Sequence, residues 1–218
     1  MQGVVCNLCP HKCRLNPGKS GFCGVRENRN GEIYLVTYGK FSAIQIDPIE
    51  KKPLYHVNPG SRTLSLGSIG CNLRCLWCQN WNISQSRDFS GLTAMTKVEI
   101  LDLAKSKDLP SITFTYNEPI INYEFVIEAS KYFKDNGIET YIVTAGYIDK
   151  EFRYDFFQNI SAVNVDLKSF SNETYKKIGG DLNTVLDTLL FLKKQGIWFE
   201  ITTLLIPGLN DSKEEIKQ

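Results

Sequence analysis

The sequence predicts an α/β protein with a parallel sheet, and two patterns support this prediction. Segments rich in β-branched and aromatic residues alternate with segments of helical periodicity, from residue 111 onward at intervals of roughly 25 to 35 residues, as in βα units. Distinctive short motifs also follow the strand segments directly. Ligands of parallel sheets bind at the carboxyl ends of the strands, so we expect a functional site there. The predicted strands are residues 63–69, 111–116, 139–144, 162–167 and 198–205.

The segments between these strands predict helices with recognisable ends. Thr96 and Glu99 form a capping box for a helix that stops before Pro110. The pair Asn136-Gly137 ends the next helix. The predicted helices cover residues 96–105, 120–134, 149–158 and 182–195, and a last one begins with Asp211 or Ser212 as its cap.

The first 62 residues follow a different pattern. Residues 1–30 hold four cysteines but too few apolar side chains for a core of their own, so we expect a small metal-stapled module. Two strand-like segments flank Gly39-Lys40 and predict a β-hairpin over residues 32–46, followed by an extended connector over residues 47–56. The expected parts are a Cys-rich metal-binding module over 1–30, a β-hairpin and connector over 31–62, and the α/β domain over 63–218.

Composition limits the classes of partner. The chain has 25 Lys and Arg against 24 Asp and Glu, a net charge of +1, which gives no electrostatic reason to expect nucleic acid or an anionic membrane. No stretch reaches about 18 consecutive apolar residues, and the N-terminus lacks the apolar segment of a signal peptide. We therefore expect a soluble protein of the reducing cytoplasm, where clustered cysteines usually bind metal.

The seven cysteines form two groups, and none follows Cys78. An odd number excludes a fully paired disulfide set within one chain. Four thiolates can complete a tetrahedral site for zinc or a single iron, or hold an iron–sulfur cluster, and His11 could replace one of them. The group of four, C-x2-C-x3-C-x9-C, consists of Cys6, Cys9, Cys13 and Cys23.

The second group has three cysteines on the loop after the first predicted strand. Cys71, Cys75 and Cys78 follow the pattern C-x3-C-x2-C. Three protein ligands on a four-iron cluster leave one iron open to bind another molecule. Gly70 and the polar residues of the loop suit a backbone that wraps a cluster and donates amides to its sulfides.

This spacing, with Trp77 directly before the last cysteine, resembles the signature of the radical S-adenosylmethionine superfamily. The resemblance implies that Cys71, Cys75 and Cys78 hold a 4Fe–4S cluster whose open iron binds the amino and carboxylate groups of S-adenosylmethionine. In this family the reduced cluster cleaves the cofactor to methionine and a 5′-deoxyadenosyl radical, which abstracts a hydrogen atom from a substrate. The implied fold is a (β/α) barrel, usually of six strands. Because we count five, we expect a partial barrel and a chain truncated at its C-terminus.

Four more motifs resemble family motifs, each at the end of a predicted strand. In the family, a Gly-Gly-Glu or similar triplet after the second strand holds the cofactor's ammonium group. Here Glu118-Pro119 matches the end of that motif, whereas Tyr116 and Asn117 replace its glycines. The other motifs are Thr144-Ala145-Gly146, Asp166-Leu167-Lys168 and Pro207-Gly208. Taken alone, Glu118 also suits a helix N-terminus and Asp166-Lys168 also suits a surface ion pair. The cofactor contacts that the resemblance implies are Trp77, Asn117, Glu118, Thr144, Gly146, Asp166, Lys168 and Pro207.

Residues 47–56 and the N-terminal cysteines resemble one branch, the AmmeMemoRadiSam-system radical enzymes, related to pyruvate formate-lyase activating enzymes. The resemblance implies an oxidoreductase with an electron donor such as ferredoxin or flavodoxin. Its substrate would be a small molecule or a glycine on a partner protein. Hydrogen abstraction needs no catalytic base, so we name no catalytic side chain, and His56 is expected to be a solvated or packed loop residue.

Two other function classes stay open at this point. One is an iron–sulfur electron-transfer or redox-sensing protein without S-adenosylmethionine chemistry. The other is a structural zinc protein that binds a partner. Three clustered cysteines without a nearby histidine make a poor closed zinc site, which counts against the second class.

Overall fold

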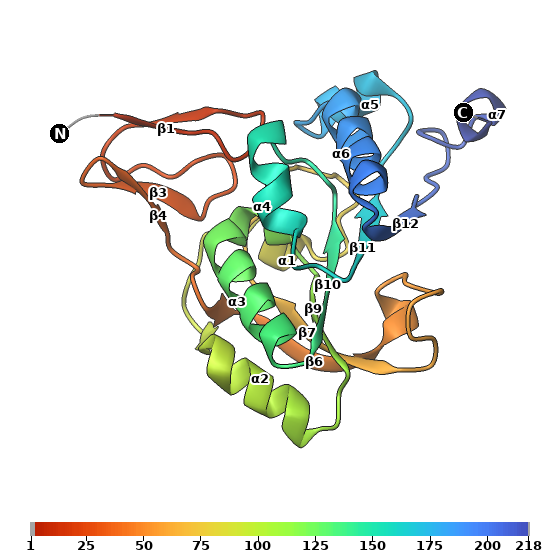
Figure 1. The fold of residues 1–218 in the computed structure, drawn as a ribbon. Coiled ribbons are helices and arrows are strands. Elements are labelled where there is room, and N and C mark those ends of the chain that lie inside the picture. The colour runs from red at the N-terminus through yellow and green to blue at the C-terminus, as the bar shows by residue number, and fades with distance from the viewer. Residues whose placement is uncertain (1–2, 218) are drawn as a thin grey trace.

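The computed structural model describes residues 3–217 and is centred on a six-stranded sheet in the order β12-β11-β10-β9-β7-β6 (Figure 1). Every neighbouring pair in it is parallel except the pair that β6 (Ala43–Pro48) forms with β7. The predicted α/β class with five parallel strands is therefore confirmed. The parallel strands are β7 (Arg62–Gly67), β9 (Ser111–Phe114), β10 (Glu139–Thr144), β11 (Ala162–Asp166) and β12 (Trp198–Thr202).

The predicted helices are present. In α2 (Lys97–Ser106), Thr96 and Glu99 form the expected capping box. Ser212 caps the short α7 (Lys213–Ile216), whereas α5 (Asn172–Lys177), which periodicity did not reveal, is capped by Ser171. The other helices of the α/β domain are α1 (Trp81–Ser84), η2 (Pro119–Asn122), α3 (Tyr123–Asp135), η3 (Lys150–Phe152), α4 (Arg153–Phe157) and α6 (Leu182–Gln195).

The two faces of the sheet differ in chemistry. Alternate strand residues such as Leu64, Ile112 and Val163 pack with the helices in the main core. Residues at the intervening strand positions, such as Thr63 and Thr113, lie on the opposite face, where their hydroxyl oxygens are 2.7 Å apart. The sheet therefore has an apolar outer face under the helices and a polar inner face. Among residues 3–217, no helix is long and apolar enough to cross a membrane.

A β-hairpin is present, but its predicted position around Gly39-Lys40 is wrong. The hairpin pairs β3 (Arg26–Arg29) with β4 (Glu32–Leu35) through the turn Asn30-Gly31, where both residues have positive φ, 56° and 92°. The segment after Gly39 instead gives β5 (Lys40–Phe41), which pairs with β8 (Thr93–Ala94), and then β6. Six paired residues on a covered sheet stabilise β6 more than an isolated two-stranded ribbon would.

The predicted extended connector over residues 47–56 is also wrong. The chain turns through η1 (Ile49–Lys51) directly after β6. Ile49 and Leu54 are both 0% exposed and pack against Tyr141 and Ala162 on the inner face of the sheet. The segment folds inward because these apolar side chains leave water. It therefore closes the end of the sheet at which the parallel strands begin.

The N-terminal segment packs beside α3 and α4 (Figure 1). Its two short strands, β1 (Val4–Cys6) and β2 (Cys13–Leu15), pair antiparallel and place Cys6 opposite Cys13. Leu8 and Leu15 join the main core, and Arg26 makes a two-point ion pair with Glu124 of α3 at 2.5 and 2.7 Å. The segment is thus anchored to the α/β domain by both apolar and ionic contacts.

Candidate active site

A cavity of about 560 Å³ collects most of the predicted site residues. It lies at the carboxyl ends of the parallel strands and extends along the inner face of the sheet toward Lys51 and Lys52. The loops after β7, β9, β10 and β11 all contribute, as expected for a parallel sheet. The predicted residues that line it are Cys71, Cys75, Trp77, Cys78, Asn117, Glu118, Thr144, Asp166 and Lys168.

The loop between β7 and α1 positions the three cysteines. It begins at Gly70, where φ is 86° and a Cβ atom would lie 2.5 Å from a backbone oxygen of the N-terminal segment. The loop amide of Leu73 donates to the Cys71 sulfur at 3.4 Å, and the Cys78 sulfur lies 3.3 Å from the Ser84 hydroxyl. A glycine is therefore required at the start of the loop, and its backbone already turns amides toward sulfur.

The thiols of Cys71 and Cys75 lie in an environment that favours their neutral form. Burial, with help from the nearby Glu118 carboxylate, raises the pKa of the Cys71 thiol far above its ordinary value. Burial also raises the pKa of Cys75 to about 11. Among residues 3–217, no three His, Cys, Asp or Glu side chains stand in the arrangement of a formed metal site. Because the thiolate is the metal-binding form, binding of a cation and ionisation of these thiols would occur together.

Glu118 is the most buried acidic group of the cavity, at 2% exposure. Its carboxylate accepts hydrogen bonds from the Thr144 hydroxyl at 2.5 Å and from the amides of Ala145 and Ile120 at 2.9 and 3.1 Å. Burial raises the pKa of Glu118 even though these three donors favour the ionised form. The carboxylate joins the ends of β9 and β10, and a bound cation would stabilise its charge.

Asp166 and Lys168 form an ion pair at the end of β11. Their side chains are 32% and 17% exposed, so the pair is half-buried in the cavity wall rather than solvated on the surface. Burial alone would lower the pKa of Lys168, but the Asp166 carboxylate raises it above its ordinary value. The pair presents one positive and one negative group to the same cavity.

Trp77 and Asn117 are half-buried in the cavity wall. The Asn117 amide donates to the Gly70 carbonyl at 3.0 Å, and its oxygen accepts from the Ser68 amide at 2.9 Å. These bonds hold both ends of the turn that leads into the cysteine loop. Asn117 therefore positions the loop, a role that the sequence did not indicate.

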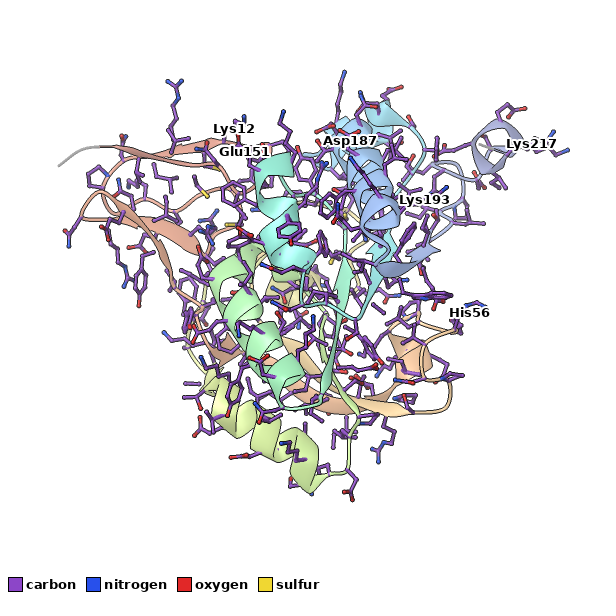
Figure 2. The ribbon with its side chains drawn as sticks, in the orientation of Figure 1. Lys12, His56, Glu151, Asp187, Lys193 and Lys217 are labelled. Carbon is purple, nitrogen blue, oxygen red and sulfur yellow. The ribbon has the colours of Figure 1, made fainter. Side chains whose placement is uncertain are left out.

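Three residues that the sequence brought to attention, Gly146, Pro207 and His56, are not among the described residues that line the cavity. Gly146 packs under α6, and its amide donates to the Thr144 hydroxyl at 3.0 Å, so it orients Thr144. Pro207 is exposed on the loop after β12. His56 is 73% exposed on the surface (Figure 2) and lies 3.2 Å from Glu200.

The cavity also contains residues that sequence patterns missed. Asn80 lies two positions after the last cysteine and donates to the Tyr116 carbonyl at 2.9 Å. Tyr116 has φ 69°, a conformation that bulky residues rarely adopt, and its ring lines the cavity. Lys51 and Lys52 line the far end. Two signals in the sequence pointed toward these residues: the replacement of a family glycine by Tyr116, and the resemblance of residues 47–56, which contain Lys51 and Lys52, to one branch of the family.

The four N-terminal cysteines lie in one region, although among residues 3–217 no three of them stand in the arrangement of a formed metal site. Cys9 interacts electrostatically with Cys6, Cys13 and Cys23, and burial raises the pKa of its thiol to about 12. The Cys13 sulfur accepts from the amide of Phe22 at 3.4 Å. As in the cysteine loop of the cavity, backbone amides are directed at sulfur.

The comparisons with known proteins identify the family. The Radical SAM superfamily matches residues 66–218, which contain the cysteine loop and all five parallel strand ends. The chain belongs to the radical SAM superfamily. Membership implies a 4Fe–4S cluster and S-adenosylmethionine as cofactors, and it confirms the resemblance drawn from the sequence.

Two sequence relatives and one solved structure are similar to this chain. The uncharacterized protein MJ0808 of Methanocaldococcus jannaschii is 42% identical over 215 residues, covering 98% of this chain and 64% of that protein. The pyruvate formate-lyase-activating enzyme of Clostridium pasteurianum is 29% identical over 164 residues, 73% of this chain and 68% of the enzyme. Streptococcus suis SuiB bound to precursor peptide SuiA has the same fold, with a TM-score of 0.54, 18% identity and coverage of 71% and 35%.

The residues present fit a radical SAM cluster and cofactor. Three half-buried cysteines on one loop could supply sulfur ligands, and a bound cation would favour ionisation of Cys71 and Cys75, whose pKa values burial raises. The glycine before the first cysteine leaves no room for a side chain beside the loop. Glu118 and the pair Asp166-Lys168 offer acidic and basic groups to the amino and carboxylate ends of a zwitterionic cofactor in the same cavity.

Proposed function

We propose that this chain is a radical SAM oxidoreductase that removes a hydrogen atom from its substrate. A cluster bound by Cys71, Cys75 and Cys78 would supply one electron to S-adenosylmethionine and so generate the radical that abstracts hydrogen. The observation that supports this best is the cavity itself. It brings these three cysteines together with Glu118 and the Asp166-Lys168 pair, from loops far apart in the sequence.

The side chains around the cysteines would bind and orient the cofactor. Glu118 would accept from its ammonium group, because the carboxylate lines the cavity and its present donors are all neutral. Lys168 would attract its carboxylate while Asp166 holds the lysine in place. Trp77 would pack against the adenine, and Thr144 keeps Glu118 oriented. These residues position reactants and exclude water, and the cofactor supplies the chemistry.

The electron donor would be a small redox protein such as ferredoxin or flavodoxin. Leu76, between the second and third cysteines, is 88% exposed, and Trp81 just after the loop is 68% exposed. Exposed apolar side chains next to a redox centre suit a transient protein contact. A cytoplasmic location is part of the proposal, because all seven cysteines are free thiols.

The relation to pyruvate formate-lyase-activating enzymes makes a glycyl-radical activation one candidate for the substrate step. A small-molecule substrate is the other, and the polar inner face of the cavity is compatible with it. We also propose that Cys6, Cys9, Cys13 and Cys23 bind a second metal, either zinc, iron or an iron–sulfur cluster. The nearness of Cys9 to the other three cysteines and the amide donor to the Cys13 sulfur support this proposal.

Anaerobic reconstitution tests the proposed function. With iron, sulfide and reductant, the chain should give a 4Fe–4S absorption and electron paramagnetic resonance signal that changes when S-adenosylmethionine is added, and it should form 5′-deoxyadenosine. A Cys75→Ala variant should lose both. A chain that holds only zinc after anaerobic purification and reconstitution would favour the structural zinc protein. A cluster that is indifferent to S-adenosylmethionine would favour the electron-transfer or sensing protein.

The N-terminal metal has its own test. The double variant Cys6→Ser/Cys9→Ser should lose one metal centre by elemental analysis while keeping the cluster on the cavity loop. An unchanged metal content would contradict the second site.

A further inference from the structure

The far end of the cavity is built by a segment that does not belong to the cofactor motifs. Lys51, Lys52 and Pro53 line it. They follow β6, whose end pairs with the beginning of β7, so they lie away from the cysteine loop along the inner face of the sheet. Ile49 and Leu54 are 0% exposed on either side of them. The lysines are therefore held by a packed segment rather than by a free loop.

We call this far end, lined by Lys51, Lys52 and Pro53, the floor of the cavity. One carboxylate at the floor faces two ammonium groups. The Asp47 side chain accepts from Lys52 at 2.7 Å and from Lys51 at 2.9 Å. Asp47 and Lys52 are 5% and 1% exposed, whereas the Lys51 side chain is 64% exposed. The three groups carry a net charge of +1. The excess positive charge at this end of the cavity would attract an anion.

Tyr116 completes the floor in a strained conformation. Its hydroxyl donates to Asp47, and the Lys52 ammonium lies 4.2 Å from the centre of its ring. Its φ of 69° is unusual for an aromatic residue, and Gly67 faces it where a Cβ would approach the ring to 2.7 Å. Backbone strain of this kind persists mainly at functional sites. The chain thus keeps an unfavourable backbone conformation and a glycine in order to place this ring beside the charged cluster.

We propose that the floor is a subsite for an anionic oxygen group, a carboxylate or a phosphate, on a small substrate. Lys51 provides the ammonium that reaches the anion, and Asp47, Lys52 and Tyr116 hold the geometry of the floor. Glu118 and Lys168, which we assign to the cofactor, line the same cavity at the strand ends. Anion binding follows from the charges and geometry alone, whereas naming the anion as part of the substrate rests on the proposed function.

A titration of the 218-residue chain labelled with ¹³C-lysine tests the subsite by nuclear magnetic resonance. The probes are acetate, inorganic phosphate and the neutral analogue acetamide, all at constant ionic strength. The Lys51→Gln variant assigns the Lys51 signal. Lys131→Gln is the matched control, because Lys131 also pairs with an aspartate at 2.9 Å and i,i+4 spacing and is 67% exposed, but lies on α3 outside the cavity.

We expect a saturable shift of the Lys51 signal with acetate or phosphate and none with acetamide. Binding, followed at the signal of the neighbouring Lys52, should weaken about tenfold in Lys51→Gln, as for loss of one charged hydrogen bond, and should be unchanged in Lys131→Gln. Whichever of acetate and phosphate binds more tightly indicates whether the subsite takes a carboxylate or a phosphate group. Equal shifts at Lys51 and Lys131, or no saturable shift with either anion, would overturn the proposal.

The titration needs no cluster, so its failure is distinguishable from failure of the proposed function. A reconstituted chain that forms 5′-deoxyadenosine but binds neither anion would overturn the subsite alone. A chain that binds an anion at Lys51 without forming 5′-deoxyadenosine would support the subsite and contradict the radical chemistry.

Discussion

His11 of the N-terminal segment contacts Asn72 of the cysteine loop, with its Nε2 atom 2.8 Å from the Asn72 carbonyl oxygen. The imidazole also stacks on Phe22, with ring centres 4.0 Å apart, and Phe22 packs under the guanidinium of Arg74 at 4.1 Å. These contacts join the segment with four cysteines to the loop with three. Folding of the first segment and the geometry of the active-site loop are therefore coupled.

A His11→Ala substitution should loosen this loop. We expect a loss of about 1 kcal/mol in the free energy of unfolding, as for one part-buried hydrogen bond, and faster hydrogen exchange at the loop amides near Asn72. Mass spectrometry of exchanged peptides would measure the second effect. The neighbouring Lys12→Ala is the control, because its ion pair with Asp149 is long, at 3.8 Å, and the Lys12 side chain is 63% exposed. Exchange in the loop that stays at the wild-type rate in His11→Ala would contradict the coupling.

Glu118→Gln should weaken binding of S-adenosylmethionine while the cluster still assembles. The substitution keeps the size of the side chain but removes the negative charge proposed to meet the ammonium, so affinity should fall about tenfold or more. Equilibrium binding to the reconstituted protein measures this effect, with iron content as a check on the cluster. Glu173→Gln is the control, because Glu173 is 82% exposed on α5. Equal affinity in Glu118→Gln and wild type would remove Glu118 from the cofactor site.

Local patterns were sufficient to predict the strands, most helices and the grouping of the cysteines. The segment that forms β10 was predicted with its observed bounds, because β-branched residues and a flanking Asn-Gly turn determine it locally. The capping box at Thr96 likewise depends only on residues three apart. The motifs of Glu118 and Asp166 met in one cavity because parallel strands bring their carboxyl ends to one edge.

The floor of the cavity could not be predicted in the same way. Gly39-Lys40 and Asn30-Gly31 are both turn signals. Which of them closes a hairpin is decided only by the pairing of β6 with β7, about 20 residues further along the chain. That pairing carries Lys51 and Lys52 under the sheet. The positive φ of Tyr116 likewise depends on Asp47, which is distant in sequence. Long-range contacts, rather than local propensity, determine this half of the site.

Gly67→Ala should destabilise the protein because of Tyr116. A Cβ at residue 67 would lie 2.7 Å from the ring and 3.2 Å from the Thr115 carbonyl oxygen, so we expect a loss of about 1 to 3 kcal/mol in the free energy of unfolding. In a Tyr116→Gly background the ring is absent, and the same substitution should cost less. Urea unfolding of the four proteins of this cycle gives the coupling energy. Gly3→Ala serves as control, since its nearest contacts are at 3.6 Å or more. Equal costs of Gly67→Ala in both backgrounds would show that the ring does not require the glycine.

Asp47→Asn should destabilise the chain by about 3 kcal/mol at neutral pH, because it leaves the buried Lys52 ammonium without its carboxylate. Asp135→Asn is the control. It removes an exposed partner of Lys131, so its cost should stay within about 0.5 kcal/mol. Urea unfolding at pH 7 measures both changes.

The Asp47–Lys52 ion pair should also determine part of the protein's sensitivity to acid. Burial alone would raise the pKa of Asp47, but hydrogen bonds from Lys52, Tyr116 and Lys51 outweigh it and lower the pKa below its ordinary value. The stabilisation is therefore fully present above the unfolded-state pKa of about 4 and is lost as the pH falls toward the lower folded-state value. Below about pH 4, the free energy of unfolding should fall more steeply with decreasing pH in the wild type than in Asp47→Asn. If the plots of unfolding free energy against pH run parallel for the two proteins in that range, protonation of Asp47 does not account for the acid sensitivity.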